Sequence, residues 1–294
     1  VRVTLKQEQL DLPDGDFVDL AWTSNLSSVY APIVILLHGL EGSVNSPYAK
    51  GILKTVVNNH WQGVLMHFRG CSGRHNIRDR SYHSGETGDL HSLITTLKQR
   101  YPTRPLAAIG ISLGGNVLLK YLGEQSSRCR LAAAMAISVP FDLADGARTL
   151  DKGFARLYQR HLVKSLHNKV RDKFNNRQAP IDFTKLDQWK NFYSFDHHVT
   201  APLHGFAGAD DYYTRSSSKS FIKHISTPTL ILHSKDDPFM TQQAIPCEEE
   251  LSDSVTLELT DKGGHVGFVY GSLPGKEEYW IEKRMSDFFK TIFT

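Results

Sequence analysis

The sequence predicts an α/β fold in which helices cover both faces of a mostly parallel central sheet. Short segments that are apolar on every residue alternate with segments whose apolar residues recur at helical spacing, and Gly and Pro fall between them. This alternation is typical of βαβ units. No internal repeat or low-complexity stretch interrupts it. A chain of 294 residues is long enough for one large α/β domain or two modest ones.

The first part of the chain predicts a β-hairpin, and the central strands follow it. A Pro-Asp-Gly-Asp turn at 13–16 separates two short alternating runs that end by Trp22. Ile33–Leu37 is apolar throughout, as a central strand is when helices cover the sheet on both sides. Further strands, the last of them edge-like, are expected at 64–66, 106–111, 132–137, 229–232 and 255–259. About six mostly parallel strands result.

Two segments show the spacing of amphipathic helices. Apolar residues at 90, 93, 94 and 97 predict a helix behind Ser84, with Glu86 and Asp89 in its first turn and Pro102 after its end. A second pattern, at 281, 285, 288, 289 and 292, predicts a carboxy-terminal helix. We expect the apolar stripe of this last helix to pack on one face of the sheet.

The interval 141–225 contains no convincing buried strand, so we expect an inserted helical cap on a core formed by residues 1–140 and 226–294. The interval carries 14 Lys and Arg against 9 Asp, and 13 of the 30 aromatic residues of the chain. These aromatic residues line an apolar pocket or form a small core of the cap, and both interpretations stay open. We expect its basic face to be solvated, with contact to anionic lipid headgroups as the alternative.

The sharpest local signal is Gly110–Gly115, which reads Gly-Ile-Ser-Leu-Gly-Gly and matches G-x-S-x-G between a strand and a helix. Such a tight turn requires residues without side chains at 110 and 114, because the backbones pass close to each other. The turn lifts the Ser112 hydroxyl out of the sheet and places it beside a helix N-terminus, which favours negative charge. We expect Ser112 to be a catalytic nucleophile; the alternative is a chance glycine-rich turn.

A serine hydroxyl needs a base and an orienting acid, which follow it in the order Ser, acid, His in this kind of fold. His265 is the best candidate base, because it lies in a glycine-flanked loop between the last strand and the final helix. We expect Asp237 to be the acid, since it follows a buried strand at the sheet edge where catalytic groups collect. Asp236 is the alternative acid, although its position favours bracing the loop.

An oxyanion hole needs two N–H donors directed at the charge that develops in the transition state. The backbone of Leu113, directly after the nucleophile, is expected to supply one. The backbone of Leu40, in the segment His-Gly-Leu-Glu-Gly at 38–42, is the candidate for the other. We expect His38 to be a buried orienting residue rather than a catalyst.

These segments together resemble the motifs of the YheT-like α/β-hydrolases. The matching segments are His-Gly-Leu-Glu-Gly at 38–42, Phe-Arg-Gly-Cys at 68–71, Gly-Ile-Ser-Leu-Gly-Gly-Asn at 110–116, Ala-Asp-Asp-Tyr-Tyr at 209–213, Asp-Asp-Pro-Phe at 236–239 and Gly-Gly-His-Val-Gly-Phe at 263–268. The resemblance extends from about Leu12 to the final helix. It implies an α/β-hydrolase fold, a Ser-Asp-His relay and esterase-like activity, and it leaves the substrate open.

We therefore expect a serine hydrolase that cleaves carboxylic esters through an acyl-serine intermediate, with no cofactor and no metal. Its partner would be a small-molecule ester, with acyl and lipid-like esters included. A thioesterase or lipase is an alternative, as is a non-catalytic protein that binds a small ligand on the same scaffold. The His197-His198 and Asp210-Asp211 pairs match no known metal-ligand spacing, and nucleotide-binding glycine motifs are missing.

The composition bears on the cellular compartment and on partners. Cys71, Cys129 and Cys247 are odd in number and widely spaced, which favours a reducing, cytoplasmic compartment over a disulfide framework. A net charge of +3 is too small to indicate nucleic acid. No apolar run approaches the ~20 residues that cross a bilayer, so we expect a soluble protein. The chain begins at Val1 without Met, which leaves a preceding targeting segment open. The sequence does not reveal the oligomeric state.

Overall fold

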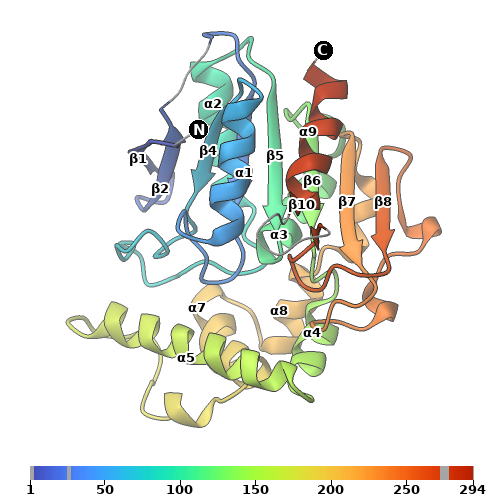
Figure 1. The fold of residues 1–294 in the computed structure, drawn as a ribbon. Coiled ribbons are helices and arrows are strands. Elements are labelled where there is room, and N and C mark those ends of the chain that lie inside the picture. The colour runs from blue at the N-terminus through green and yellow to red at the C-terminus, as the bar shows by residue number, and fades with distance from the viewer. Residues whose placement is uncertain (1–2, 25–27, 272–277, 294) are drawn as a thin grey trace.

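The computed structural model of the protein describes residues 3–24, 28–271 and 278–293. Its centre is an eight-stranded sheet in the order β1-β2-β4-β3-β5-β6-β7-β8 (Figure 1). The strands are β1 (Leu5–Asp11), β2 (Phe17–Thr23), β3 (Ile33–Leu37), β4 (Gln62–Met66), β5 (Leu106–Ile111), β6 (Ala133–Ile137), β7 (Thr229–Ser234) and β8 (Val255–Thr260). The first hairpin is antiparallel and joins β4 antiparallel, whereas β3 to β8 run parallel. The predicted mostly parallel sheet is confirmed.

Helices cover both faces of this sheet, as the sequence predicts (Figure 1). The helices α1 (Pro47–Asn58) and α9 (Trp280–Phe293) pack on one face. The helices α2 (Gly88–Arg100) and α3 (Leu113–Gln125) pack on the other face, and a 3-10 turn at Ser126–Arg128 follows α3.

Two details near these helices differ from the sequence-based expectation. The helix expected behind Ser84 begins only at Gly88, because the N–H of Glu86 closes a turn onto the carbonyl of His83 at 3.1 Å. Glu86 therefore precedes the helix instead of lying in its first turn. In addition, a short hairpin of β9 (Val269–Tyr270) and β10 (Glu278–Tyr279) precedes α9.

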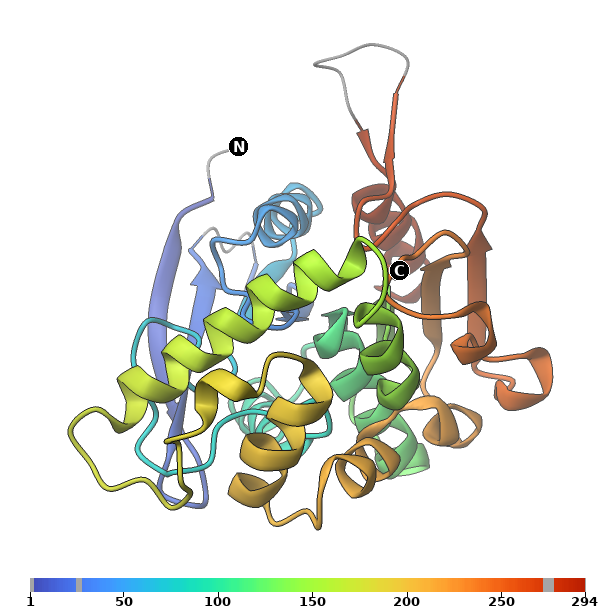
Figure 2. The ribbon, with the colours of Figure 1, turned by 90° about the horizontal axis from the view of Figure 1, so that it is seen from below.

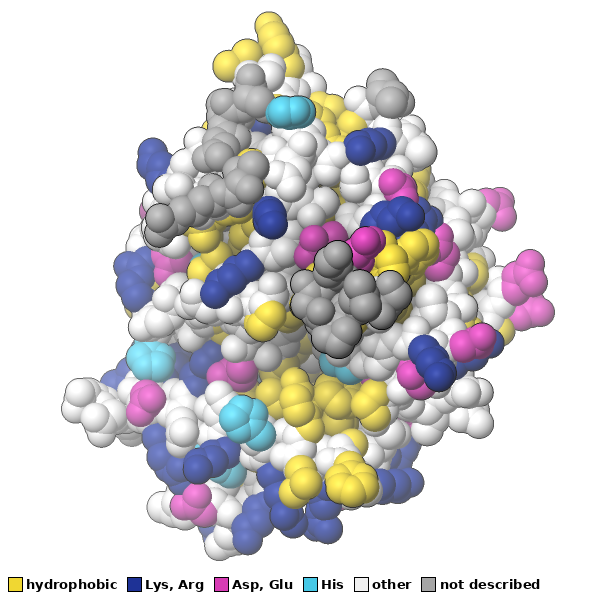
Figure 3. All heavy atoms as spheres, viewed as in Figure 1, with side chains coloured by type: hydrophobic (Ala, Val, Ile, Leu, Met, Phe, Trp, Pro, Cys, Tyr) yellow, Lys and Arg dark blue, Asp and Glu magenta, His cyan; other side chains and the backbone are white. Residues whose placement is uncertain are grey.

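The described chain between β6 and β7 is helical and lies beneath the carboxyl ends of the parallel strands (Figure 1, Figure 2). We call residues 141–225 the cap; its boundaries as a domain stay a prediction. It contains α4 (Leu143–Leu150), α5 (Ala155–Phe174), α6 (Phe192–Phe195), α7 (Ala201–His204) and α8 (Ala209–Ser216), with 3-10 helices at Leu186–Gln188 and Lys219–His224 and a π-helical turn at Asp196–Thr200. Lys and Arg side chains are frequent on its surface (Figure 3). Two further 3-10 turns, Gln242–Ala244 and Glu248–Glu250, follow β7.

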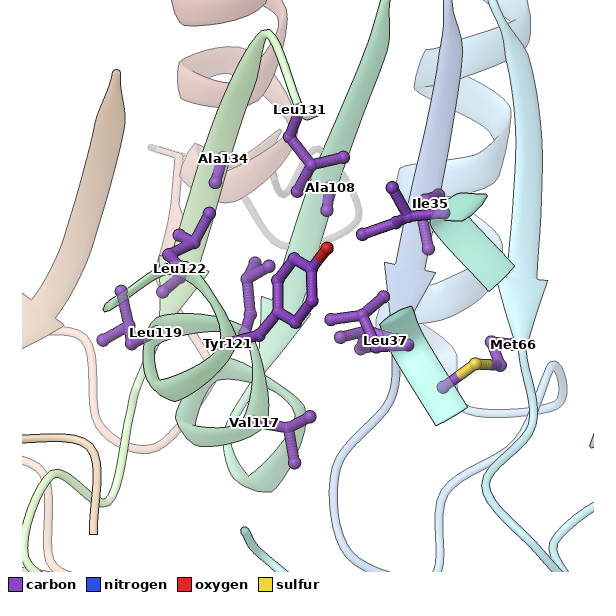
Figure 4. Close-up of a cluster of buried hydrophobic side chains, with 14 of the residues drawn as sticks. Ile35, Leu37, Met66, Ala108, Val117, Leu119, Tyr121, Leu122, Leu131 and Ala134 are labelled. Atoms are coloured by element: carbon purple, nitrogen blue, oxygen red, sulfur yellow. The ribbon is translucent and has the colours of Figure 1, made fainter. Parts of the chain in front are cut away.

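The core consists of two apolar layers, one on each face of the sheet. Side chains along a strand point alternately to its two sides, so each central strand contributes to both layers. In β3, Ile33, Ile35 and Leu37 join the layer under α2 and α3, whereas Val34 and Leu36 join the layer under α1 and α9. Figure 4 shows part of the first layer, where side chains of α3 meet those of the strands. The continuous apolar pattern of β3 is thus explained by burial on both faces.

A buried ion network connects the turn of the first hairpin to α2. Arg69, which is 3% exposed, donates to both carboxylate oxygens of Asp89, at 2.6 and 2.8 Å. It also donates to Asp14 at 2.7 Å and to Asp16 at 3.0 Å. Burial opposes the charge on the guanidinium, but hydrogen bonds and attraction from Asp89 and Asp14 outweigh it and raise the pKa of Arg69. The network fixes the hairpin against the rest of the sheet.

Replacing Arg69 should destabilise the whole fold. In Arg69→Met three neighbouring carboxylates lose their shared cation, and we expect the free energy of unfolding to fall by about 3–5 kcal/mol. Urea denaturation followed by circular dichroism measures this loss. The control is Arg171→Met, because Arg171 pairs with Asp187 on the surface, where we expect a cost under about 1 kcal/mol. Equally small losses in both variants would show that the buried network is dispensable.

Candidate active site

Ser112 lies in a sharp turn between β5 and α3. Its φ of 52° and ψ of −119° fall where residues other than glycine are rarely found. A Cβ atom at Gly110 would lie 2.4 Å from the carbonyl oxygen of Gly114, and a Cβ atom at Gly114 would lie 2.6 Å from that of Leu37. The lack of side chains at 110 and 114 is therefore what allows this turn to pack against the end of β3.

The Ser112 hydroxyl is the first member of a continuous hydrogen-bonded chain. Its Oγ lies 2.9 Å from Nε2 of His265, and Nδ1 of His265 lies 2.9 Å from Oδ2 of Asp237. The side chain of Asp237 is 1% exposed and that of His265 is 12% exposed. With the Nδ1 proton donated to the carboxylate, Nε2 has a free lone pair for the proton of the serine hydroxyl.

Asp236, the other candidate acid, holds the loop that carries His265. Its Oδ1 accepts hydrogen bonds from the N–H groups of Gly263, at 2.9 Å, and Gly264, at 2.8 Å. The hydroxyl of Ser234 donates to the same oxygen. The bonds from Ser234 and the two glycines lower the pKa of Asp236. Of the two neighbouring aspartates, the structure therefore brings Asp237 to His265 and places Asp236 in a bracing position.

Two further contacts fix the His265 loop. The N–H of Val266 donates to Oγ of Ser138, which follows β6, at 3.0 Å. The ring of Phe239 lies against the imidazole, with centroids 4.0 Å apart. Val266 itself has a positive φ of 64°, an unfavourable conformation for a β-branched residue that these contacts must hold. Sequence reasoning missed Ser138, because no motif links it to the loop.

Leu40 and Leu113, the residues expected to supply oxyanion donors, both line the same cavity as Ser112. Leu113 is the first residue of α3, so the helix itself leaves its N–H without an acceptor. Within the described part of the chain, neither this N–H nor that of Leu40 donates a hydrogen bond. Both groups are thus available to a ligand in the cavity.

His38 supports the strand end that precedes Leu40. It is fully buried, and its Nε2 accepts a hydrogen bond from the N–H of Phe68 at 3.1 Å. Its Nδ1 lies 2.7 Å from the carbonyl oxygen of Gly39. Burial lowers the pKa of His38 to about 3, which keeps the ring neutral. His38 therefore orients the neighbouring backbone, and both of its ring nitrogens bond to backbone groups rather than to Ser112 or His265.

Glu41, which follows Leu40, connects this loop to the cap. Its carboxylate accepts hydrogen bonds from Tyr82 Oη at 2.7 Å, Lys169 Nζ at 2.6 Å and Ser165 Oγ at 3.1 Å. Lys169 and Ser165 belong to α5, so the cap holds the residue adjacent to an expected oxyanion donor. Glu41 stands in a motif of the sequence, but no pattern indicates partners as far as 128 residues away.

A cavity of about 680 Å³ lies between the cap and the strand ends, and Ser112 and His265 both line it. Many of its walls are apolar side chains of the cap, and Phe239 adds another from the core. The apolar cap residues in the wall are Leu143, Ala147, Leu150, Tyr158, Leu162, Leu166, Val170, Phe174, Phe192, Phe195, Val199, Leu203, Tyr212 and Tyr213. The aromatic residues of the cap thus serve both the cavity and a small core around Trp189.

Two ionisable groups in the cavity wall, Lys173 and Asp196, have hydrogen-bond partners within the protein. Burial lowers the pKa of Lys173 to about 7, and its Nζ donates to Asn76 Oδ1 at 2.7 Å. Burial raises the pKa of Asp196 to about 6, although the hydroxyls of Thr200 and Tyr213 donate to its carboxylate. With these groups satisfied, the surface offered to a ligand is mainly apolar.

The histidine and aspartate pairs of the cap lie apart from this site. The rings of His197 and His198 are 4.8 Å apart, while Asp210 accepts a hydrogen bond from the Tyr193 hydroxyl at 3.1 Å. Asp211 accepts a hydrogen bond from the backbone N–H of Ala207, two residues before α8, at 3.0 Å. No cluster of three or more metal-ligating side chains occurs among the described residues. Over the same residues, no helix has the length and apolar character required to span a membrane.

The packing of the Ser112 turn yields a stability prediction. In Gly114→Ala the new methyl group would collide with the carbonyl oxygens of Leu37 and His38, so we expect a loss of several kcal/mol in the free energy of unfolding. The control is Gly146→Ala in α4, where the nearest atom would be 3.6 Å away and the helix should gain roughly 0.5–1 kcal/mol. Thermal and urea unfolding of both variants measure the difference. A Gly114→Ala variant as stable as the parent would refute the packing argument.

Comparison with known proteins agrees with this geometry. Residues 32–272 match the family described as alpha/beta hydrolase fold. The chain is 42% identical over 294 residues to the "Putative esterase YheT" of Escherichia coli. This alignment covers 99% of this chain and 86% of that protein. It is 30% identical to the phospholipase ABHD3 of Mus musculus over 285 residues, 94% of this chain and 69% of the relative.

Solved structures show the same architecture. The esterase Pf2001 of Pyrococcus furiosus superposes with a TM-score of 0.65 at 17% identity, covering 99% of this chain and 94% of that one. At 17% identity, this similarity shows a shared fold and nothing about activity. The family match, together with the 42% identity to YheT over nearly the whole chain, confirms the resemblance to the YheT-like α/β-hydrolases that the sequence motifs indicate. The chain belongs to the α/β-hydrolase family and is a YheT-like member of it.

Proposed function

We propose that this protein is a serine esterase that hydrolyses carboxylic esters through an acyl-Ser112 intermediate. The observation that carries the proposal is the hydrogen-bonded chain from Asp237 through His265 to Ser112 at the wall of an apolar cavity. The names of the relatives support ester chemistry, since one is called a putative esterase and another a phospholipase.

In the proposed mechanism, His265 Nε2 takes the hydroxyl proton as Ser112 Oγ attacks the carbonyl carbon of the ester. His265 then returns this proton to the alcohol oxygen, the bond from the carbonyl carbon to that oxygen breaks, and the acyl group stays on Ser112. A water molecule, deprotonated by His265, then attacks the acyl-serine. His265 returns that proton to Ser112 Oγ as the bond between Oγ and the acyl carbon breaks, and the carboxylic acid leaves. Asp237 keeps the imidazole in the required tautomer and stabilises its cationic form.

The N–H groups of Leu113 and Leu40 would bind the negative oxygen that forms in each addition step. A donor in such a position typically contributes ~2.7–4 kcal/mol to transition-state stabilisation. Leu113 also lies at the start of α3, where the helix dipole favours negative charge. Because Glu41 ties the Leu40 loop to α5, the cap would help to hold this donor in place.

The cavity supports an ester with an apolar acyl group. Its volume of about 680 Å³ is within the range of small-molecule sites, ~300–1,000 Å³. Leu143, Ala147 and Leu150 form a row along α4 that faces this space, and Tyr158 and Phe239 continue the apolar wall. A lipid-like ester belongs to this class of substrate.

Removing members of the triad should abolish turnover without additive effects. Ser112→Ala and His265→Ala should each lower kcat for p-nitrophenyl butyrate by roughly four orders of magnitude or more, and the double variant should be no worse, because the residues act as a unit. Asp237→Asn should lose about as much as either, since it favours the wrong tautomer. Asp236→Asn is the matched control and should retain most activity. Additive losses, or equal losses at 236 and 237, would contradict the assigned roles.

The length of the acyl chain should control the specificity. Each buried methylene adds ~0.8 kcal/mol of favourable transfer, so we expect kcat/KM to rise at least tenfold from p-nitrophenyl acetate to the octanoate. Ala147→Trp narrows the cavity and should remove this gain while leaving acetate hydrolysis nearly unchanged. A parent enzyme that prefers acetate would overturn the apolar-chain assignment, and one that cleaves none of the esters would favour a binding protein.

A further inference from the structure

The cap exposes large apolar side chains beside the cavity. Phe154 is 92% exposed, Leu157 is 61% exposed and Tyr158 is 45% exposed. They stand at the start of α5, where residues three and four positions apart share a helix face. Tyr158 also lines the cavity and contacts Phe239, with ring centroids 4.7 Å apart. The exposed apolar surface therefore continues into the site.

The β9–β10 hairpin contributes to the same surface from the core. Val269 is 53% exposed and Tyr279 is 51% exposed, and both line the cavity. Because exposed residues of the hairpin and of the cap line one cavity, the cavity reaches the surface between them. Figure 3 shows hydrophobic side chains gathered at this border of core and cap. We call the group the apolar rim; it consists of Phe154, Leu157, Tyr158, Val269 and Tyr279.

Positive charge borders the apolar rim. Arg156, Arg160 and Lys164 are exposed and recur every four residues along α5. The segment 152–171 contains no Asp or Glu. Arg156 lies 3.7 Å from Asp151, whereas Arg160 and Lys164 have no acidic partner among the described residues. These three residues form the basic strip of α5.

We propose that the apolar rim and the basic strip dock on the surface of a lipid bilayer that contains anionic lipids, with the cavity facing the bilayer. Apolar and aromatic side chains favour the boundary between headgroups and acyl chains, and Lys and Arg beside them are attracted by anionic headgroups. This interaction goes beyond ester hydrolysis, and binding does not require the Ser112 hydroxyl.

A bilayer fits these residues better than a second copy of the chain. In a twofold dimer the same patch faces itself, so the two basic strips would approach each other. Like charges brought together across an interface oppose association. An anionic membrane surface covers the apolar rim and also neutralises the strip. The arrangement therefore favours lipid as the occupant.

Co-sedimentation with vesicles tests the proposal on the full chain carrying Ser112→Ala, which leaves the lipids intact. We expect binding to vesicles of phosphatidylcholine with about one third phosphatidylglycerol, and much weaker binding to phosphatidylcholine alone or at high salt. Adding Phe154→Ser and Leu157→Ser should lower the affinity at least tenfold. Adding Arg160→Gln and Lys164→Gln should lower it roughly tenfold on the anionic vesicles.

Matched variants separate the rim from nonspecific adhesion. Val29→Ser with Tyr30→Ser removes equally exposed apolar side chains elsewhere, since these residues are 68% and 74% exposed. Arg128→Gln with Lys223→Gln removes two charges outside α5. Both pairs should bind vesicles as the parent does. In the Ser112 form, the Phe154 and Leu157 variant should hydrolyse p-nitrophenyl butyrate normally, because neither residue lines the cavity.

Three results would overturn the docking proposal. The first is no binding to either kind of vesicle, and the second is an equal loss in the matched variants. The third is a dimer in gel filtration that the Phe154 and Leu157 changes convert to a monomer while vesicle binding stays unchanged. If the protein binds vesicles but cleaves no ester, the docking surface is supported and the proposed esterase activity is rejected. Failure of the docking proposal can therefore be told apart from failure of the proposed function.

Discussion

The backbone of the turn that carries Ser112 packs directly on the end of β3, with no side chain between the two segments. This contact is possible only because residues 110 and 114 are glycines, whose absent Cβ atoms would otherwise collide with carbonyl oxygens. It places the serine hydroxyl at the carboxyl edge of the sheet and beside the start of α3. Since parallel strands all end at that edge, the loops after β7 and β8 bring Asp237 and His265 to the same point.

The cap completes this arrangement in two ways. It supplies much of the apolar wall of the cavity, so it would help to determine which acyl group fits beside Ser112. It also contacts the loop that holds Leu40, because Lys169 and Ser165 of α5 hydrogen bond to the carboxylate of Glu41. The helix α5 thus lines the cavity, contacts the loop of Leu40 and carries part of the rim proposed to meet a membrane. Movement of α5 would affect all three at once.

Much of the fold and of the site could be predicted from local patterns. The strand β3 is apolar throughout because both of its faces are buried. The turn at Ser112 shows the motif G-x-S-x-G, because close backbone packing leaves no room for side chains at 110 and 114. Contacts between distant segments left no such signal. Glu41 and Lys169 pair over 128 residues, and the two-residue strands of the β9–β10 hairpin are too short to show alternation. The delayed start of α2 likewise depends on a turn hydrogen bond at Glu86 that composition does not reveal.

In the proposed reaction, the hydroxyl of Ser112 is the group that attacks the substrate. The most direct measurement is covalent labelling of the native protein with a fluorophosphonate, followed by mass spectrometry of the digested chain. We expect one adduct, located on Ser112 and lost when His265 is replaced or the protein is unfolded before labelling. A native protein that stays unlabelled, or one that carries the adduct on another residue, would contradict it.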